Sequence, residues 1–321
     1  MKAIRYHELG GPEVLRLEEV PDPEPTVGEA LVTLVASGVN PAEVSRRSGR
    51  TGQAIDFPAM VGIEGAGIVS DVGEGVSKVK VGDRVIVRQP PYSYAESVAV
   101  AEDSLFAVPE GMTLVQASTV TIAYTTAWAA LSVKGGVKAG DTVLIQAVAS
   151  GVGIAAVQLA KQLGATVLGT ASTADKLEWA SQYGLDHGIN YSEQDFVSEA
   201  KTLTDGRGVD VIVDGVGGEG LVKGLASLAR GGRLTVFGGA GGRTIQLPVA
   251  ELYRNGVAVI GAGGSMTPSA DFGAILSWFA KGKLQPTIDR TWPLSEAAEA
   301  HEYQDSRRIK GKTALVIRTD E

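Results

Sequence analysis

Short runs of alternating apolar and polar residues fill the first third of the chain. The runs at residues 30–36, 66–72 and 84–87 are separated by Gly, Pro and Asp, including the pair Gly82-Asp83. A period of two places every second side chain on one face of a strand, and the separating residues are typical of turns. The pattern predicts a compact β-rich domain over residues 1–123.

The pattern changes from Asp141 onward, where apolar β-rich runs are separated by segments of helical periodicity. Six strands are predicted, at residues 142–146, 166–170, 188–191, 209–214, 233–237 and 257–261. Most of the intervening segments are long enough for a crossover helix, which is how parallel strands are connected. We therefore predict an α/β fold whose second domain, residues 124–264, is a doubly wound six-stranded parallel sheet.

The last segment, residues 265–321, combines one helix with one strand. Phe272, Ile275, Leu276 and Phe279 recur at helical spacing, and residues 313–317 form a final apolar run. A single terminal strand must find its hydrogen bonds in an existing sheet. We expect it to join the N-terminal sheet, so that residues 1–123 and 265–321 form one discontinuous domain.

Composition narrows the classes of function. A formal net charge of -8 gives no positive surface for nucleic acid or an anionic membrane. No apolar run reaches the ~18 residues of a membrane span, and the first residues lack a targeting pattern, so we expect a cytoplasmic protein. The chain has no Cys and only three widely separated His, which excludes disulfides, thiolate catalysis and Cys-ligated zinc, and argues against any metal site.

A Gly-rich turn follows the first strand of the parallel series. Gly151, Gly153 and Ala156 match Gly-x-Gly-x-x-Ala, and a helix is predicted over residues 152–163. Small residues let the backbone approach a pyrophosphate, whose charge then lies at the helix N-terminus. In a chain with 42 Gly the match alone is weak. Its place between strand and helix predicts dinucleotide binding by Ser150, Gly151, Val152 and Gly153.

The end of the second parallel strand indicates which dinucleotide binds. NAD enzymes usually carry Asp or Glu there, about 20 residues after the Gly-rich turn, to bind the ribose 2′-OH. Here no acid stands at the strand tip, and Ser172, Lys176 and, after the third strand, Tyr191 are candidates to bind a 2′-phosphate. This predicts NADPH. The alternative for Lys176 is an exposed residue in the first turn of a helix.

Together these residues resemble the zinc-independent medium-chain dehydrogenase/reductase family, in its NADPH:quinone reductase (ζ-crystallin-like) branch. The order and spacing of short motifs carry the resemblance along nearly the whole chain: residues 38–41 (Gly-Val-Asn-Pro), 62–67 (Gly-Ile-Glu-Gly-Ala-Gly), 81–85, 94–96, 208–210, 214–218 and 311–312. The resemblance implies a Rossmann domain that binds NADPH and a β-rich, GroES-like catalytic domain.

In the zinc alcohol dehydrogenases of this superfamily, Cys and His ligate the catalytic zinc where this chain has Asn40 and Ile63. The four Cys of the structural zinc lobe are absent as well. The resemblance therefore implies hydride transfer without a metal, to a small-molecule acceptor that needs little activation. A quinone is the first expectation, and an α,β-unsaturated carbonyl compound (enal, enone or acrylyl type) is the alternative. A non-catalytic NADPH-binding structural or regulatory protein is the alternative of another class.

The resemblance also assigns individual cofactor contacts. Asn40 and Thr126 are expected to hold the nicotinamide and ribose, and Arg307 to reach the nucleotide from the C-terminal segment. Strand ends are expected to line the cofactor cleft with Val216, Phe237, Gly238, Gly239 and Gly263. Each has a structural alternative: Asn40 with Pro41 is a common turn pair, Thr126 can stabilise a helix, and Phe237 can be core.

This sequence departs from the family pattern near the expected substrate. Ser150 replaces a Gly of the Gly-rich turn, Ser45 stands where many quinone reductases carry a Tyr, and Glu43 replaces an Asp. The proton donor is therefore open between water and a tyrosine, with Tyr92, Tyr94 and Tyr124 as candidates. The family also suggests a homodimer that pairs through the strand at residues 257–261.

Overall fold

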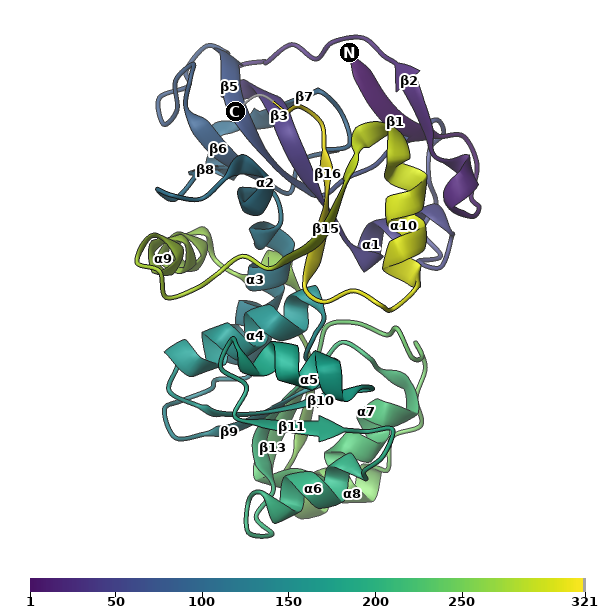
Figure 1. Ribbon diagram of the computed structural model, residues 1–321, viewed down its shortest axis with the longest axis vertical. Coiled ribbons are helices and arrows are strands. Elements are labelled where there is room, and N and C mark those ends of the chain that lie inside the picture. Colours follow the sequence, from purple (N-terminus) through teal and green to yellow (C-terminus); the bar gives the residue numbers. More distant parts are fainter. Residues whose placement is uncertain (320–321) are drawn as a thin grey trace. The chain divides into compact units, whose positions relative to one another are not determined.

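The computed structural model describes residues 1–319, so the last two residues of the predicted C-terminal segment lie outside it. By internal contacts the chain divides into two compact units. Unit 1 comprises Met1–Ile122 together with the segment from Leu276 onward, and unit 2 comprises Ala123–Ile275. In Figure 1 unit 2 has the teal and green colours, whereas unit 1 is purple, blue and yellow.

Unit 1 is built on two sheets. Its strands are β1 (Lys2–Tyr6), β2 (Arg16–Glu19), β3 (Glu29–Val39), β4 (Ala59–Met60), β5 (Glu64–Val72), β6 (Arg84–Arg88), β7 (Ser97–Ala101), β8 (Leu105–Ala107), β15 (Ile288–Pro293) and β16 (Lys312–Val316). Its helices are η1 (Pro12–Val14), α1 (Pro41–Arg47), η2 (Glu102–Ser104), α2 (Leu114–Ala117), η5 (Leu294–Glu296) and α10 (Ala297–Asp305). The small sheet has the order β2-β1-β4, and the large one β15-β16-β3-β5-β6-β8 with β7 also on β3.

The last strand of the chain lies against one of the first. β16 pairs antiparallel with β3, so that Thr313 lies opposite Val39 and Val316 opposite Ala36, and Figure 1 shows the yellow β16 beside the purple β3. The apolar side chains of β3 alternate into a core that includes Val32, Leu34 and Val69. Residues at opposite ends of the sequence thus complete the same sheet.

Unit 2 is a parallel α/β sheet. Its strands are β9 (Thr142–Ile145), β10 (Thr166–Ala171), β11 (His187–Asn190), β12 (Val209–Asp214), β13 (Leu228–Val236) and β14 (Ala258–Gly261). Its helices are η3 (Ala129–Val133), α4 (Gly151–Gln162), α5 (Ala174–Ser181), α6 (Phe196–Thr202), α7 (Gly218–Leu225), α8 (Val249–Asn255) and η4 (Gly264–Met266), while α3 (Val120–Trp128) and α9 (Ser269–Ala280) each contain a boundary between the units. The predicted six-stranded parallel sheet is confirmed.

The strand order of unit 2 is β11-β10-β9-β12-β13-β14. From β9 the chain moves outward to β11 in one direction, and from β12 outward to β14 in the other. Right-handed crossovers then place α4 and α5 on one face and α7 and α8 on the other. The order reverses between β9 and β12, and ligands of such sheets bind outside the carboxyl ends of the strands at that point.

One strand of unit 2 differs from the sequence prediction. β13 begins at Leu228, whereas the sequence predicted a start at residue 233. The additional part of the strand is separated from the rest by an interruption in the pairing with β12. Leu228 lies opposite Val209, but the next pair joins Arg233 to Val211, and the residues between them bulge out. Gly231, with a φ of 73°, allows this bulge. The apolar pattern marked only the second, regular part of the strand.

Two further predictions concern surfaces. Among residues 1–319 no helix is long and apolar enough to cross a membrane. β14 lies at the edge of the parallel sheet, so one side of its backbone has no neighbouring strand within the described chain. Pairing of that edge in a homodimer stays a prediction.

Candidate functional site

The Gly-rich turn lies at the carboxyl end of β9, next to the point where the strand order reverses. Ser150 caps α4: its hydroxyl oxygen accepts a hydrogen bond of 3.0 Å from the Gly153 N–H. A Cβ on Gly153 would lie 2.4 Å from the carbonyl oxygen of Ala147, so the turn closes only around a glycine. The 12-residue helix α4 thus begins with free N–H groups and a hydroxyl hydrogen, a set of donors that fits a pyrophosphate.

A second turn faces it from the end of β12. Asp214 is fully buried, and its Oδ1 accepts hydrogen bonds from the N–H groups of Val216 (2.6 Å) and Gly217 (2.8 Å). Burial raises the pKa of Asp214, although these two N–H groups act in the opposite direction. The carboxyl therefore fixes the backbone that carries Val216, one of the predicted cofactor contacts.

The candidates for a 2′-phosphate lie at the ends of β10 and β11. Ala171 and Asn190 are paired in register, so Ser172 and Tyr191 follow side by side at the edge of the sheet. Tyr191 is 52% exposed, and Lys176 lies in the first turn of α5. Three side chains with donor groups thus follow neighbouring strand ends. At the end of β10, where NAD enzymes carry an acid that binds the ribose, this chain has no carboxylate.

At the carboxyl ends of β13 and β14, the surface of the candidate site is formed mainly by backbone atoms. A Cβ on Gly215 would lie 2.5 Å from the ring of Phe237, and one on Gly238 would lie 2.6 Å from the carbonyl oxygen of Gly215. After β14, Gly263 leads into η4, where a Cβ on Gly264 would come within 2.9 Å of the Thr126 hydroxyl. The structure therefore brings Phe237, Gly238, Gly263 and Thr126 to the same edge as the Gly-rich turn, and Gly239 follows directly.

Asn40 belongs to unit 1, where it takes part in a buried polar cluster. Its Nδ2 donates to Glu64 Oε1 (3.0 Å), and its Oδ1 accepts a hydrogen bond from Lys312 Nζ. Lys312 Nζ also forms an ion pair with Glu64 Oε1 at 2.8 Å and donates to the Val39 carbonyl at 3.0 Å. Asn40 is 3% exposed and Glu64 0%. The cluster joins the end of β3 to the start of β5 and β16.

Two features explain how a carboxylate can be buried there. A Cβ on Gly38 would lie 2.3 Å from Glu64 Oε1, so the absence of a side chain makes room for the carboxylate. Its second oxygen, Oε2, accepts a hydrogen bond from the Ile122 N–H at 2.8 Å. Both oxygens of Glu64 are thus satisfied, which a buried charge requires.

Glu43 lies next to this cluster and differs from Glu64 in charge. Its oxygens accept hydrogen bonds from the N–H groups of Asn40 (2.6 Å) and Ile63 (3.1 Å). Burial raises the pKa of Glu43 to about 8, with the negative charge of Glu64 adding to the rise and Lys312 opposing it. At neutral pH Glu43 is therefore largely protonated, and it is Glu64 that forms the ion pair with Lys312.

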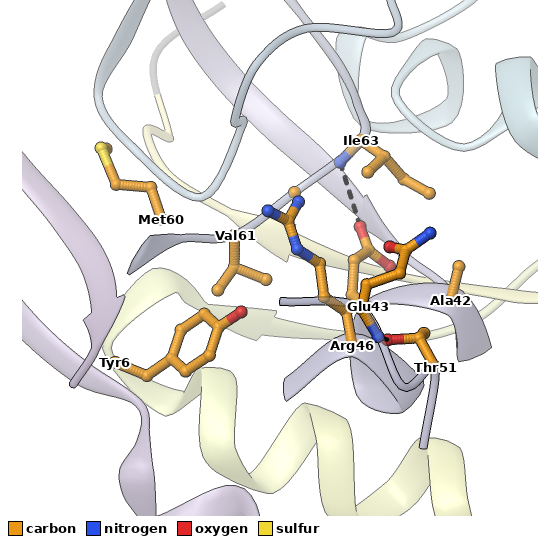
Figure 2. A pocket seen from close by; sticks show the side chains of 10 residues that line it. Tyr6, Ala42, Glu43, Arg46, Thr51, Met60, Val61 and Ile63 are labelled. Carbon is orange, nitrogen blue, oxygen red and sulfur yellow. Dashed lines mark hydrogen bonds between the residues drawn. The ribbon is translucent and has the colours of Figure 1, made fainter. Parts of the chain in front are cut away.

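A pocket of about 180 Å³ opens beside Glu43 (Figure 2). It is lined by residues of α1, of the segment between α1 and β4, of β4 and of the segment after it, with Tyr6 from β1. Its lining residues are Tyr6, Ala42, Glu43, Arg46, Thr51, Gln53, Met60, Val61, Gly62 and Ile63. Ile63, where the zinc relatives carry a His ligand, is thus a wall of the pocket. Among residues 1–319 no group of three or more His, Asp or Glu side chains is arranged to hold a metal ion.

None of the three tyrosines considered as acids is among the residues that line this pocket. Tyr94 is fully buried, and its hydroxyl is 3.1 Å from His301 Nε2. The Tyr124 hydroxyl accepts a hydrogen bond from Gln158 Nε2 at 2.9 Å, and burial raises the pKa of both Tyr92 and Tyr124. Arg307 is exposed in the turn between α10 and β16, with a φ of 58°.

Sequence reasoning missed the side chains that matter most in unit 1. Glu64 and Lys312 lie inside quoted motifs but received no role, and Tyr6 and Arg46 were not considered at all. A charged residue within an otherwise apolar strand, such as Glu64 at the start of β5, is the signal that points to a buried partner. The partner itself lies 248 positions away in the sequence and cannot be read from spacing.

Comparison with known proteins decides the family. The family model for the zinc-binding dehydrogenases matches residues 151–281, and that for the alcohol dehydrogenase GroES-like domain matches residues 26–112. The quinone oxidoreductase of Sus scrofa is 35% identical over 99% of this chain and 98% of its own length. The chain belongs to the medium-chain dehydrogenase/reductase family.

Within that family the relatives are mainly quinone oxidoreductases. The solved structure of Escherichia coli quinone oxidoreductase complexed with NADPH has a TM-score of 0.92 and 31% identity, covering 99% of this chain and 100% of that chain. The 2-haloacrylate reductase of Burkholderia is 34% identical over 98% of both chains. This medium-chain dehydrogenase/reductase is therefore an oxidoreductase. The family model whose description mentions zinc matches residues 151–281, a range that includes neither Asn40 nor Ile63.

Proposed function

We propose that this protein is an NADPH-dependent reductase that transfers hydride to a quinone without a metal ion. The observation that carries the proposal is the group of Ser172, Lys176 and Tyr191 at the ends of β10 and β11. The tip of β10 carries no Asp or Glu for the ribose 2′-OH, and the nearest acid, Asp175, lies in the first turn of α5. Similarity to quinone oxidoreductases over nearly the full length supports the acceptor class.

When bound, NADPH supplies the hydride that reduces the acceptor. Ser150 and the first N–H groups of α4 would bind its pyrophosphate, and Ser172, Lys176 and Tyr191 its 2′-phosphate. The backbone at Val216, Gly238, Gly239 and Gly263, with the side chains of Phe237 and Thr126, would line the rest of the dinucleotide. The cofactor contacts of Asn40 and Arg307, which belong to unit 1, stay predictions.

The pocket in unit 1 would hold the acceptor. Met60, Val61 and Ile63 present apolar surface, which excludes water and orients a flat molecule by contact. The buried ion pair of Glu64 and Lys312 fixes the backbone around Asn40 and thereby the position of α1, whose side chains Glu43 and Arg46 line the pocket. The product's proton would come from water.

A second candidate is reduction of an activated carbon–carbon double bond. The 2-haloacrylate reductase of Burkholderia is almost as similar to this chain as the quinone oxidoreductases are. Both reactions use the same hydride donor and need no metal, so the acceptor alone distinguishes them.

The test is oxidation of NADPH and of NADH, followed at 340 nm with the purified protein. The acceptors are 1,4-benzoquinone, 9,10-phenanthrenequinone and an enal, each with and without EDTA. Quinone-dependent oxidation of NADPH that EDTA does not change is the expected result. Turnover of the enal alone identifies the alkene reductase, and tight NADPH binding without any turnover identifies a non-catalytic protein.

A further inference from the structure

The hydroxyl hydrogen of Tyr6 lacks an acceptor in the unit 1 pocket. Tyr6 is 1% exposed, and within the described residues no acceptor lies in hydrogen-bond reach of its hydroxyl, to whose oxygen the neighbouring Arg46 can only donate. Figure 2 shows this hydroxyl pointing toward the Arg46 side chain. A guanidinium offers N–H groups only, so it cannot accept the hydroxyl hydrogen. A buried hydroxyl without an acceptor is costly, which indicates that a ligand supplies one.

The ring of Tyr6 cannot easily turn its hydroxyl elsewhere. Tyr6 is the last residue of β1 and pairs with Ala59 of β4. Its ring contacts the edge of the Phe57 ring, with centroids 5.6 Å apart. Strand pairing and ring packing together hold the hydroxyl at the pocket.

The electrostatics around these donors are positive. Burial raises the pKa of Tyr6, and the guanidinium of Arg46 is the largest influence that opposes this rise. Among residues 1–319 Arg46 forms no ion pair with a carboxylate, whereas its neighbour Arg47 lies 4.0 Å from Asp305. Glu43, the one carboxyl that lines the pocket, is largely protonated at neutral pH and so contributes little negative charge.

We propose that this pocket binds an acceptor that carries a carboxylate, which the Arg46 guanidinium and the Tyr6 hydroxyl bind as donors. The proposal rests on the second candidate of the proposed function, reduction of an activated carbon–carbon double bond, because it names the substrate class of the same pocket. About 180 Å³ is below the roughly 300–1,000 Å³ of pockets for drug-sized ligands, so the acceptor is small. Arg46 and Tyr6 thereby determine specificity and leave the hydride transfer itself to the cofactor.

A conjugated keto acid illustrates the balanced reaction. In 4-oxo-2-pentenoate the ketone activates the double bond, and the carboxylate stays unchanged. Hydride from the nicotinamide forms a C–H bond at the carbon β to the ketone, the π electrons of the double bond move toward the ketone, and water supplies the proton at the α carbon. The nicotinamide is oxidised by two electrons and the alkene is reduced by two.

The experiment compares 4-oxo-2-pentenoate with its methyl ester as acceptors for NADPH oxidation. The ester keeps the activated double bond and removes the negative charge. With the unmodified protein we expect a kcat/KM for the acid at least tenfold above that for the ester. The substitution Arg46→Gln should lower kcat/KM for the acid about ten- to hundredfold and lower it much less for the ester, so that the acid-to-ester ratio falls about tenfold, because only the acid loses a charge-assisted hydrogen bond.

Two further variants sharpen the result. Tyr6→Phe should lower kcat/KM for the acid about three- to tenfold through KM, and Arg46→Lys should retain part of the preference. Arg50→Gln is the matched control, because Arg50 is an exposed arginine nearby that pairs with Asp305 and does not line the pocket. It should change neither acceptor more than twofold. Equal activity with acid and ester, or equal losses on both in Arg46→Gln, would overturn the proposal.

A binding measurement separates this inference from the proposed function. Saturation-transfer NMR with the same acid and ester needs no turnover. Normal quinone reduction without a preference for the acid refutes the carboxylate site and leaves the reductase. Binding of the acid that Arg46→Gln abolishes, in a protein that oxidises no NADPH, supports the carboxylate site and refutes the reductase.

Discussion

The candidate site in unit 2 is formed mainly by backbone groups, whereas that in unit 1 is formed by side chains. At the edge of the parallel sheet in unit 2, backbone N–H groups and glycines form most of the surface, and its Gly-rich turn comes from the single stretch of residues 150–153. In unit 1, the buried cluster consists of side chains, and Asn40, Glu64 and Lys312 come from three distant segments. A site made of backbone depends on local turns, whereas a site made of side chains depends on the whole tertiary structure.

The largest expected effect comes from breaking the unit 1 cluster. Lys312→Met leaves the carboxylate of Glu64 buried without its cation, and such a change costs about 3–5 kcal/mol of unfolding free energy. Urea denaturation followed by fluorescence measures it. Lys161→Met is the control, because the Lys161–Asp186 pair is about one-third exposed and should cost less than about 1 kcal/mol.

Adding Glu64→Gln to Lys312→Met should restore part of the stability, because the uncompensated charge disappears. If Lys312→Met is no more destabilising than Lys161→Met, the ion pair does not stabilise unit 1 as described.

The second effect is a dependence of stability on pH that comes from Glu43. Its pKa is about 8 in the folded protein and near the ordinary 4.5 of a glutamate in the unfolded chain, so the folded state binds more protons between these values. Stability is therefore greatest below about pH 4.5 for this group and falls as the pH rises toward 8, by at most about 1.4 kcal/mol per pH unit.

Glu43→Gln should flatten this part of the stability curve, measured by urea denaturation at a series of pH values. The exposed Glu110 is the control, and Glu110→Gln should leave the slope unchanged. A slope that persists in Glu43→Gln would assign it to another group.

In unit 2 the corresponding test changes the backbone of the Gly-rich turn. Gly153→Ala places a Cβ against the Ala147 carbonyl, so the turn must shift and NADPH affinity should fall about ten- to hundredfold. Titration of NADPH fluorescence measures the dissociation constant. Gly220→Ala in α7 has open space around its Cβ and should leave the affinity unchanged. Equal affinities in both variants would separate this turn from the cofactor.

The smallest effect is expected at the 2′-phosphate. Lys176→Ala removes one cation from the first turn of α5 and should weaken NADPH about tenfold, while NADH changes less than twofold. Lys201→Ala, in α6, is the control. The ratio of kcat/KM for the two cofactors measures the effect, and a parallel loss with both would contradict a contact with the phosphate.

The contrast between the units also explains what sequence could predict. The parallel strands of unit 2 are apolar runs, the Gly-rich turn is continuous, and both were found at nearly the correct residues. That Ser172 and Tyr191 follow neighbouring strand ends could be predicted because parallel strands end at one edge, and their contact with the cofactor stays a prediction. The bulge in β13 was missed because residues 229–232 carry no alternating pattern.

The site in unit 1 was harder to predict from the sequence, for a physical reason. Its sheet was predictable from alternation, but the partner of Glu64 depends on the antiparallel pairing of β16 with β3. Tyr6 belongs to a strand whose pattern shows only that one face is buried, and whether its hydroxyl finds an acceptor depends on the neighbouring Arg46. Such pairings follow from packing in three dimensions and leave no periodic trace.

The pairing of β16 with β3 has a consequence for biosynthesis. A ribosome releases the chain from its N-terminus, so residues 36–39 of β3 emerge long before their partner β16, which begins 273 positions after Val39. All six strands of the parallel sheet have emerged well before β16 does. Unit 2 can therefore fold while unit 1 still has an open sheet edge, the kind of surface that binds chaperones or other nascent chains.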